Sequence, residues 1–323
     1  MNENFRVKFW GVRGSYPTPG PQTVFYGGNT ACVSVQVAGQ TIILDAGTGI
    51  IPLGRELLAQ SRRSGQAVRA VLLFSHLHHD HTQGFPFFAP AYNPASALFL
   101  YGPGASEQAL EDLLAHNQTP PAFPVTLREM HSTKEIHSLT ETESLVLDEN
   151  GVRLARGAGQ TSPSAVTIRL MKSHAHPGGV YCYRIEWRGQ SLVYATDTEG
   201  YVGGDRRLTA FAKGADLLIH DAQYTPEDYA AKQGYGHSTP QMAAELARAA
   251  GVKRLALFHH DPANDDETVH DLEEQAQTIF GGAFAAREGQ ELELADAQLA
   301  GARQFQPSLN HSGIAVPRPL GKG

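Results

Sequence analysis

Residues 75–84 read SHLHHDHTQG, with four histidines and one aspartate among ten residues. The stretch follows the apolar run RAVLLF at residues 69–74, which is typical of a strand covered on both faces. The loop leaving such a strand can direct alternate side chains into one cleft, and imidazole and carboxylate are common ligands of zinc, iron and manganese. The spacing H-x-H-x-D-H therefore predicts a metal site, with the ligands His76, His78, Asp80 and His81. We expect His79 to point away; the alternative is a solvated histidine-rich loop.

Two metal ions need more ligands than this loop holds, because each ion takes about three protein ligands and a water. Other histidines and aspartates follow apolar runs further along the chain, at the ends where open sheets carry functional loops. The candidates are His174, His176, Asp197, His220, Asp221, His237, His259 and His260. Each alone is more often a structural histidine or a turn aspartate. Their recurrence at strand ends favours a binuclear site.

The composition narrows the class of protein. With 323 residues and 41% hydrophobic content, the chain can bury a sizeable core, and its two cysteines exclude a disulfide framework and disfavour a cysteine zinc site. The sequence has no run of about 18 apolar residues and no secretory signal at its start, which predicts no membrane association and a cytoplasmic location. The net charge of -7 comes without a long basic run. A small substrate is therefore favoured over an extended polyanion, although nucleic acid is not excluded.

Strand hairpins followed by helix–strand units occur twice along the chain. A hairpin is expected over residues 31–49, with its turn at Gly39 and Gln40. The predicted helices cover residues 51–63, 84–92, 106–117, 239–251 and 264–280, and residues 119–165 are expected to form short strands with loops. This order predicts an α/β fold of two mixed β-sheets packed face to face, with helices outside. We expect one domain over residues 1–298 and a loosely ordered tail over residues 299–323.

The order of the motifs LDAGTG, SHLHHDH, HPGG before YRIE, YATDTE, GHST and LFHHDP resembles the metallo-β-lactamase superfamily over about residues 5–265. The resemblance is greatest to the branch that contains tRNase Z and the cyclic phosphodiesterase associated with carbon–phosphorus lyase. It implies a four-layer αββα sandwich with a binuclear metal site. It also implies that one ion is held by His76, His78 and His176, that the other is held by Asp80, His81 and His259, and that Asp197 bridges both. The family's spacing favours His176 over His174, and His259 over His260.

The same resemblance implies a chemistry. A hydroxide that bridges two divalent ions would be the nucleophile, with zinc as the favoured metal and manganese or iron as alternatives. Asp80 would orient this nucleophile or accept its proton, and His237 would act beside the phosphate as a proton donor or transition-state stabiliser. The other interpretation of His237 is a neighbour of a helix cap, because Thr239 and Pro240 begin a helix well. Asp45 and His220 would support the site through hydrogen bonds.

The leading hypothesis is a phosphodiesterase for a small or cyclic phosphodiester, since GHST is superfluous for a β-lactam or thioester hydrolase. Hydrolysis of a lactone, thioester or β-lactam at the same site is one alternative. A tRNA 3′-end endonuclease is another, disfavoured because residues 95–165 contain few clustered Lys or Arg residues. A non-hydrolytic di-iron redox or sensor protein is a third, disfavoured by His78, where such relatives typically carry Glu. Relatives are often dimers, so the resemblance allows a homodimer.

Overall fold

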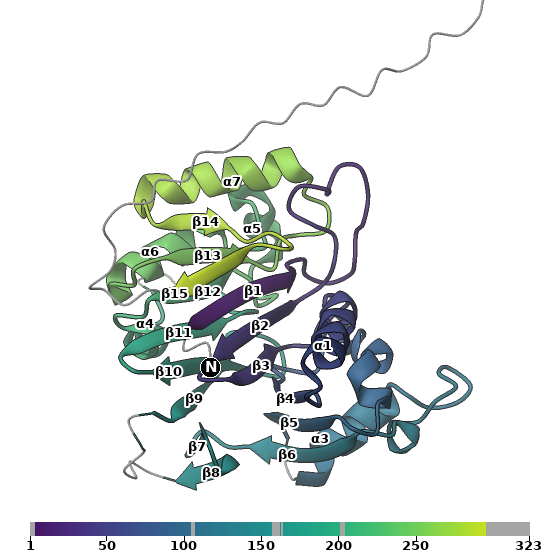
Figure 1. The fold of residues 1–323 in the computed structure, drawn as a ribbon. Coiled ribbons are helices and arrows are strands. Elements are labelled where there is room, and N and C mark those ends of the chain that lie inside the picture. Colours follow the sequence, from purple (N-terminus) through teal and green to yellow (C-terminus); the bar gives the residue numbers. More distant parts are fainter. Residues whose placement is uncertain (1–3, 105–106, 157–161, 163, 201–203, 295–323) are drawn as a thin grey trace, which may run out of the picture.

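The structure is a computed structural model that describes residues 4–104, 107–156, 162, 164–200 and 204–294. Within these residues, two mixed sheets lie face to face and helices cover their outer faces (Figure 1). The strand order is β15-β1-β2-β3-β4-β5-β6 in the first sheet and β14-β13-β12-β11-β10-β9-β7-β8 in the second. The predicted four-layer α/β architecture is confirmed.

The first sheet is antiparallel at its N-terminal side and parallel from β3 to β6. Its strands are β1 (Phe5–Gly11), β2 (Cys32–Val37), β3 (Gln40–Leu44), β4 (Arg69–Leu73), β5 (Ala97–Pro103), β6 (Thr133–Leu139) and β15 (Glu291–Leu294). The predicted hairpin is β2–β3. Its two-residue turn consists of Ala38 and Gly39, with φ of 51° and 76°, and not of Gly39 and Gln40 as predicted, because Gln40 already pairs with Val37. Two positive φ values in a row match the twist of the flanking strands.

The second sheet is antiparallel from β8 to β11 and parallel from β11 to β14. Its strands are β7 (Glu143–Asp148), β8 (Gly151–Arg156), β9 (Val166–Ser173), β10 (Val180–Trp187), β11 (Gln190–Ala195), β12 (Leu217–Asp221), β13 (Leu255–Phe258) and β14 (Ala283–Ala285). In register, Ala195 of β11 lies opposite His220 of β12, and Asp221 lies opposite Phe258 of β13. The carboxyl ends of these three strands therefore meet at one edge of the sheet.

The helices divide between the two outer faces. They are α1 (Ile50–Ser64), α2 (His79–Thr82), α3 (Glu107–His116), α4 (Arg206–Ala212), α5 (Pro226–Lys232), α6 (Pro240–Ala250) and α7 (Asp266–Ile279), with the 3₁₀ turns η1 (Phe85–Phe87), η2 (Ala89–Tyr92) and η3 (Leu127–Glu129). The prediction of a helix at residues 84–92 is wrong. Because Pro86 and Pro90 disfavour α conformation in the residue before each of them, the segment forms two 3₁₀ turns instead. No described helix is long and apolar enough to cross a bilayer.

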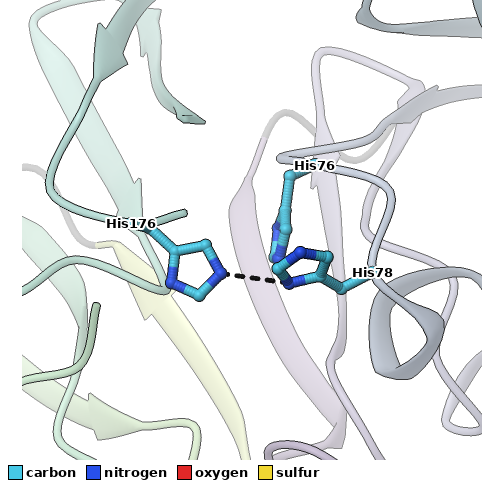
Figure 2. A group of neighbouring side chains, drawn as sticks. All are labelled: His76, His78 and His176. Carbon is cyan, nitrogen blue, oxygen red and sulfur yellow. Dashed lines mark hydrogen bonds between the residues drawn. The ribbon is translucent and has the colours of Figure 1, made fainter. Parts of the chain in front are cut away.

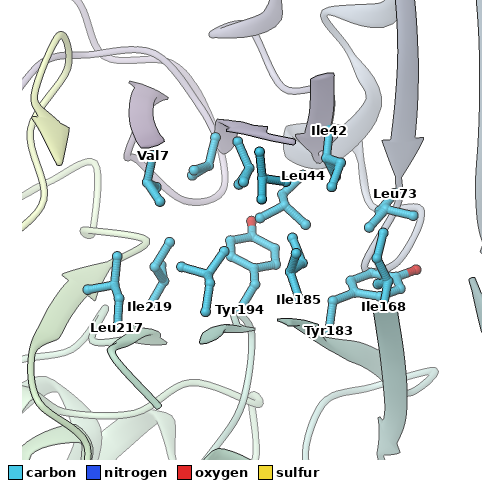
Figure 3. Packing of buried hydrophobic residues seen from close by; sticks show 14 of the residues in the cluster. Val7, Ile42, Leu44, Leu73, Ile168, Tyr183, Ile185, Tyr194, Leu217 and Ile219 are labelled. Atoms are coloured by element: carbon cyan, nitrogen blue, oxygen red, sulfur yellow. The ribbon is translucent and has the colours of Figure 1, made fainter. Parts of the chain in front are cut away.

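The main core lies between the sheets and draws side chains from both (Figure 3). Val7, Leu44 and Leu73 of the first sheet face Ile185 and Ile219 of the second, and all five are almost fully buried. A second cluster packs α1 against the outer face of the first sheet, and a third packs α4 and α6 against the second. These three layers of apolar contact hold the strand ends, and the loops that leave them, in fixed positions.

After the last strand of the second sheet, the chain returns to the first sheet. After β14, strand β15 pairs antiparallel with β1, with Phe5 opposite Leu294. The sequence did not predict α5, β14 or β15. The domain boundary at residue 298 stays a prediction, and the tail expected over residues 299–323 lies outside the described residues.

Candidate metal centre

Seven imidazole and carboxylate side chains meet at one edge of the sandwich, beyond the carboxyl ends of β4, β11 and β13. They are His76, His78, Asp80, His81, His176, Asp197 and His259, the seven residues that the sequence nominated. Ligand atoms of His76, His78 and His176 all lie within 4.8 Å of one another. The same holds for Asp80, His81, Asp197 and His259. The structure thus brings together two groups, each large enough for one ion. Two further groups overlap with them through His237: one is His176, Asp197 and His237, and the other is Asp221, His237 and His259.

The first group consists of three imidazoles that face one another (Figure 2). His176, from the β9–β10 loop, places Nε2 3.0 Å from His78 Nδ1. His76 Nε2 is buried and has no hydrogen-bond partner among the described residues. A buried nitrogen without a partner is costly unless something else satisfies it. Three converging nitrogens therefore fit a cation better than a hydrogen-bond network.

The second group interleaves two carboxylates with two imidazoles. Asp80 Oδ2 lies 3.3 Å from His81 Nε2 and 3.1 Å from His259 Nε2. Asp197 Oδ1 lies 3.2 Å and 3.3 Å from the same two nitrogens. The other oxygen of Asp197, Oδ2, faces the first group, at 3.6 Å from His76 Nε2 and 3.8 Å from His176 Nε2. Asp197 therefore has one oxygen for each group.

The protonation states of the first group and of the two carboxylates suit metal binding. For His81, burial opposes the charged imidazolium, but the carboxylates of Asp197, Asp80 and Asp45 outweigh it and raise the pKa of His81 well above its usual value. Burial lowers the pKa of His76 well below its usual value, and burial also lowers the pKa of His78 and of His176. Burial opposes the ionisation of Asp80 and Asp197, but neighbouring histidines outweigh it and hold the pKa of both carboxyls well below their usual range. Neutral imidazoles and ionised carboxylates are the forms that bind metal. This donor set fits two divalent ions.

Asp45 supports the second group from behind, as the sequence suggested. Its Oδ2 lies 2.8 Å from His81 Nδ1 and accepts a hydrogen bond from the Tyr194 hydroxyl at 2.8 Å. Its Oδ1 accepts the backbone N–H of Ser75 at 2.7 Å. A carboxylate on Nδ1 keeps the proton there, which leaves His81 Nε2 available to a metal. Asp45 therefore fixes both the loop and the tautomer.

Other contacts to the ligands were not predicted from the sequence. The side chain of Gln223 places Oε1 2.9 Å from His259 Nδ1, and the carbonyl oxygen of Gly236 lies 3.2 Å from His176 Nδ1. The backbone N–H of Ser15 donates to Asp80 Oδ2 at 2.8 Å. Two of these contacts use backbone atoms, which any residue type supplies. Of these three contacts, only that of Gln223, two residues after Asp221, depends on a particular side chain and could have been predicted from the sequence.

His237 lies beside the ligands with Asp221 behind it. Its Nδ1 is 2.8 Å from Asp221 Oδ2, and its ring stacks on that of His259 with centroids 5.1 Å apart. Burial opposes the charged imidazolium, but the Asp221 carboxylate outweighs it and raises the pKa of His237 to about 9. His237 is also the neighbour of a helix cap, since the side chain of Thr239 accepts the N–H of Met242 at the start of α6. His237 is thus a proton-carrying side chain at the edge of the site.

The remaining candidates lie apart from the seven ligands. His79 and His174 are exposed. His260 is buried, with Nε2 2.9 Å from the carbonyl oxygen of Ala286. His220 is also buried: its Nδ1 lies 2.7 Å from the carbonyl oxygen of Asp221, and its Nε2 lies 3.4 Å from Thr198 Oγ1. Its support of the site therefore runs through the backbone of Asp221.

Two clefts open beside the ligands. One, of about 1300 Å³, is lined by residues 174–179 together with Glu199, Tyr229, Met242 and Glu245. The other, of about 440 Å³, contains His76 and His78 in its wall, with Leu113, Lys172 and Tyr181. The smaller volume lies within the range of small-molecule sites in proteins, and the larger one exceeds it. Residues 177–179 line both clefts, so the clefts adjoin along the β9–β10 loop, and the cluster is accessible to a substrate from either one.

The two-sheet sandwich and the imidazole–carboxylate cluster at its edge define a metal-dependent hydrolase. The chain belongs to the metallo-β-lactamase superfamily, because the model of the beta-lactamase superfamily domain matches residues 40–260. The membership expected from the motifs is confirmed. A ribonuclease Z of Gemmatimonas aurantiaca is 27% identical to it over 320 residues, which cover 90% of this chain and 96% of the relative.

Solved structures share the fold. The metallo-β-lactamase fold protein YhfI from Bacillus subtilis aligns with a TM-score of 0.62 at 20% identity, covering 90% of this chain and 99% of YhfI. A diphosphatase from the PhnP family aligns with a TM-score of 0.59 at 16% identity, covering 89% of this chain and 97% of that protein. At these identities, the alignments show a common architecture.

Proposed function

We propose that this protein is a phosphodiesterase for small or cyclic phosphodiesters that uses two divalent ions. The observation that carries the proposal is His237, held beside both ligand groups by Asp221 at 2.8 Å. A leaving oxygen needs a proton, and a histidine whose pKa is raised to about 9 carries one at neutral pH. The relatives named ribonuclease Z and the PhnP-family diphosphatase support phosphoryl chemistry.

The assignment of the ligands is part of the proposal. The first ion would be held by His76, His78 and His176, the second by Asp80, His81 and His259, with Asp197 between them. Zinc suits this imidazole-rich set, and manganese or iron are the alternatives. When bound, such ions supply Lewis acidity and lower the pKa of a coordinated water.

Side chains of the protein would orient the attacking water and transfer the protons. Asp80 would orient the attacking water or accept its proton, because its carboxylate lies between His81 and His259 and is fixed by the N–H of Ser15. His237 would donate a proton to the leaving oxygen, and Asp221 would hold its imidazole in position. Asp80 and His237 both contact His259, so the proposed base and the proposed acid lie close to each other in the site.

Transfer RNA 3′-end cleavage is the second candidate, and the ribonuclease Z relatives favour it. The charge of the chain weighs against it. Residues 95–165 contain four basic and nine acidic residues, and a polyanion needs basic contacts for affinity. Incubation of the protein with a tRNA precursor separates the two candidates: removal of the 3′ trailer at a rate above that on small diesters would replace our proposal.

A substrate panel tests the main proposal. The protein is loaded with zinc, manganese or iron and assayed on bis(p-nitrophenyl) phosphate, a lactone, a thioester and a β-lactam. We expect turnover of the diester, and a loss of about 10²- to 10⁴-fold in His237→Ala with both metals retained. His79→Ala, an exposed histidine of the same loop, is the control and should keep full activity. Turnover of the thioester or lactone alone would contradict the proposal.

We also propose a cytoplasmic location. Cys32 and Cys182 are both free and buried. Free thiols persist in a reducing compartment, so this observation supports the proposal. The homodimer that the family resemblance allows stays a prediction, which sedimentation of the purified protein would test.

A further inference from the structure

The 440 Å³ cleft is continuous with the first ligand group. Its wall includes His76 and His78, and it extends from them toward Leu113 of α3 and toward Lys172 and Tyr181, which are paired residues of β9 and β10. A substrate whose phosphate lies at the ligands would therefore reach into this cleft with the group attached to that phosphate. The side chains that line the cleft would then determine which substituent of the phosphate the protein binds.

Lys172 gives the cleft an uncompensated positive charge. Its side chain is half-buried and lies over Gly179, where an added Cβ would come within 2.8 Å of Lys172 Cε. The acid that touches its backbone is already engaged: Glu141 accepts the N–H of Lys172 at 2.8 Å and pairs with Arg207 at 2.8 Å. Within the described part of the chain, no carboxylate forms an ion pair with the Lys172 ammonium. A half-buried cation without a partner favours an anionic ligand.

The rest of the wall is largely apolar. Leu77 and Leu113 line it, and 48% of Leu113 is exposed, in contrast to the buried leucines of the same helix. Tyr181 closes the floor, with its hydroxyl donating to the carbonyl oxygen of Leu139 at 2.8 Å. Its polar end is therefore occupied, and because only 6% of the residue is exposed, it adds a small apolar surface to the cleft. Apolar walls with a single cation suit a ligand that has a flat apolar body and one anionic group.

The larger cleft on the other side of His176 has the opposite charge. Glu199 and Glu245 line it, and its described lining contains neither Lys nor Arg. An anionic group there would be repelled by these carboxylates, whereas the Lys172 cleft would attract it. The two sides of the site therefore discriminate the two ends of a diester by charge.

We propose that the Lys172 cleft binds a second anionic group of the substrate, joined to the scissile phosphate through an apolar body such as a nucleoside. The leaving end of the diester faces the acidic cleft and carries no further negative charge. This inference rests on the proposed phosphodiesterase function. It restricts the substrate to compact diesters with a second anion on one side, and it disfavours a polyanion that crosses the site in both directions.

Two substrates that differ by one phosphate test the inference. Thymidine 5′-(p-nitrophenyl phosphate) has one negative charge, and its 3′-phosphorylated form adds the second anion at the far side of the nucleoside. We expect the protein to prefer the 3′-phosphorylated substrate by about tenfold or more in kcat/KM, mainly through KM, as befits one charge-assisted hydrogen bond. Lys172→Met should abolish this preference and leave the simpler substrate unchanged within about twofold. Lys213→Met removes an exposed lysine beyond α4 and is the matched control, which should keep the preference.

Binding gives a second measurement that does not depend on turnover. Thymidine 3′,5′-bisphosphate, titrated into the metal-loaded protein in a calorimeter, should bind about tenfold more weakly to Lys172→Met, with the metal content of the variant unchanged. Equal losses on both substrates would place Lys172 at the scissile phosphate and overturn the inference, as would an unchanged preference. If the parent protein cleaves neither diester nor bis(p-nitrophenyl) phosphate, the phosphodiesterase proposal itself fails, which is a separate result.

Discussion

Three side chains of the metal centre leave the main chain at residues with a left-handed backbone. Asp45, Asp197 and His259 have φ of 59°, 51° and 63°. Each directly follows or closely follows the last residue of a strand, so the positive φ turns the chain sharply and aims the side chain into the site. A side-chain-bearing residue pays about 1–3 kcal/mol for this conformation. The contacts of the three side chains to the cluster, and a metal ion when bound, compensate for that cost.

Asp45→Asn tests how far one residue behind the ligands controls metal affinity. An amide in place of the carboxylate cannot accept from His81, Ser75 and Tyr194 together without placing an N–H against another donor. We expect affinity for the second metal to fall about 10- to 100-fold. Competition with a chromogenic chelator measures it.

The matched control is Asp216→Asn. Asp216 is also buried and accepts the N–H of Ser191 at 2.7 Å, but it lies at the start of β12, away from the ligands. This variant should lose stability and keep the metal affinity of the parent protein. Equal affinities in the two variants would show that Asp45 only stabilises the fold.

The sequence predicted the members of the cluster but not the contacts that hold them. The family resemblance implied His176 rather than His174, and the structure brings His176 into the cluster and leaves His174 exposed. Ser15 and Gly236 contact ligands through the backbone N–H and C=O that every residue has. Such contacts depend on the packing of segments far apart in sequence, which no local pattern encodes.

The turn between α5 and α6 is the element that contacts His176 and leads into His237. Glu199, after β11, accepts the N–H of Gly234 and of Gly236 at 2.8 Å and 3.0 Å, and also the Tyr229 hydroxyl at 2.9 Å. These contacts fix the turn so that the carbonyl oxygen of Gly236 lies against His176 Nδ1, and the next residue in the chain is His237. One carboxylate thus fixes both the proposed metal ligand His176 and the proposed proton donor His237.

Gly236→Ala and Gly234→Ala form a matched pair for this turn. Both glycines have positive φ, 93° and 90°, so alanine strains the backbone similarly at each, by about 1–2 kcal/mol. Only at position 236 does the added Cβ meet a neighbour, His176 Nδ1, at 2.3 Å. We expect both variants to lose similar thermal stability, and Gly236→Ala alone to bind the first metal at least about tenfold more weakly. Similar metal affinities in both would show that His176 moves aside without cost.

At the scale of elements, the long periodic segments were predictable and the short ones were not. α1, α6 and α7 bury an apolar stripe, which the sequence shows as helical spacing. α5 has no buried residue, so it has no stripe, and its seven residues follow only from Thr225 as cap and Pro226 at the first position. β15 alternates glutamate with leucine over four residues, which is too short to separate from a turn.

The whole molecule is closed by β15, the strand that returns from the second half of the chain to the first sheet. It pairs with β1 over four residues, from Phe5 opposite Leu294 to Lys8 opposite Glu291. Leu294 is buried in the core between the sheets, and the side chain of Gln190 donates to its carbonyl oxygen. Without this strand, β1 would present an unpaired edge. The C-terminal part of the described chain is therefore tied to the first sheet by strand pairing as well as by side-chain packing.

Two truncations test this closure together with the predicted boundary at residue 298. Removal of residues 299–323 should leave the urea midpoint of unfolding unchanged, because the sequence VPRPLGKG at its end favours no packed element. Removal of residues 291–323 should lower the free energy of unfolding by about 3 kcal/mol or more, since it loses the burial of Leu294 and the ladder to β1. Denaturant titrations of the metal-loaded proteins measure both. If the shorter truncation costs as much as the longer one, the domain extends beyond residue 298 and the strand pairing of β15 is not what closes it.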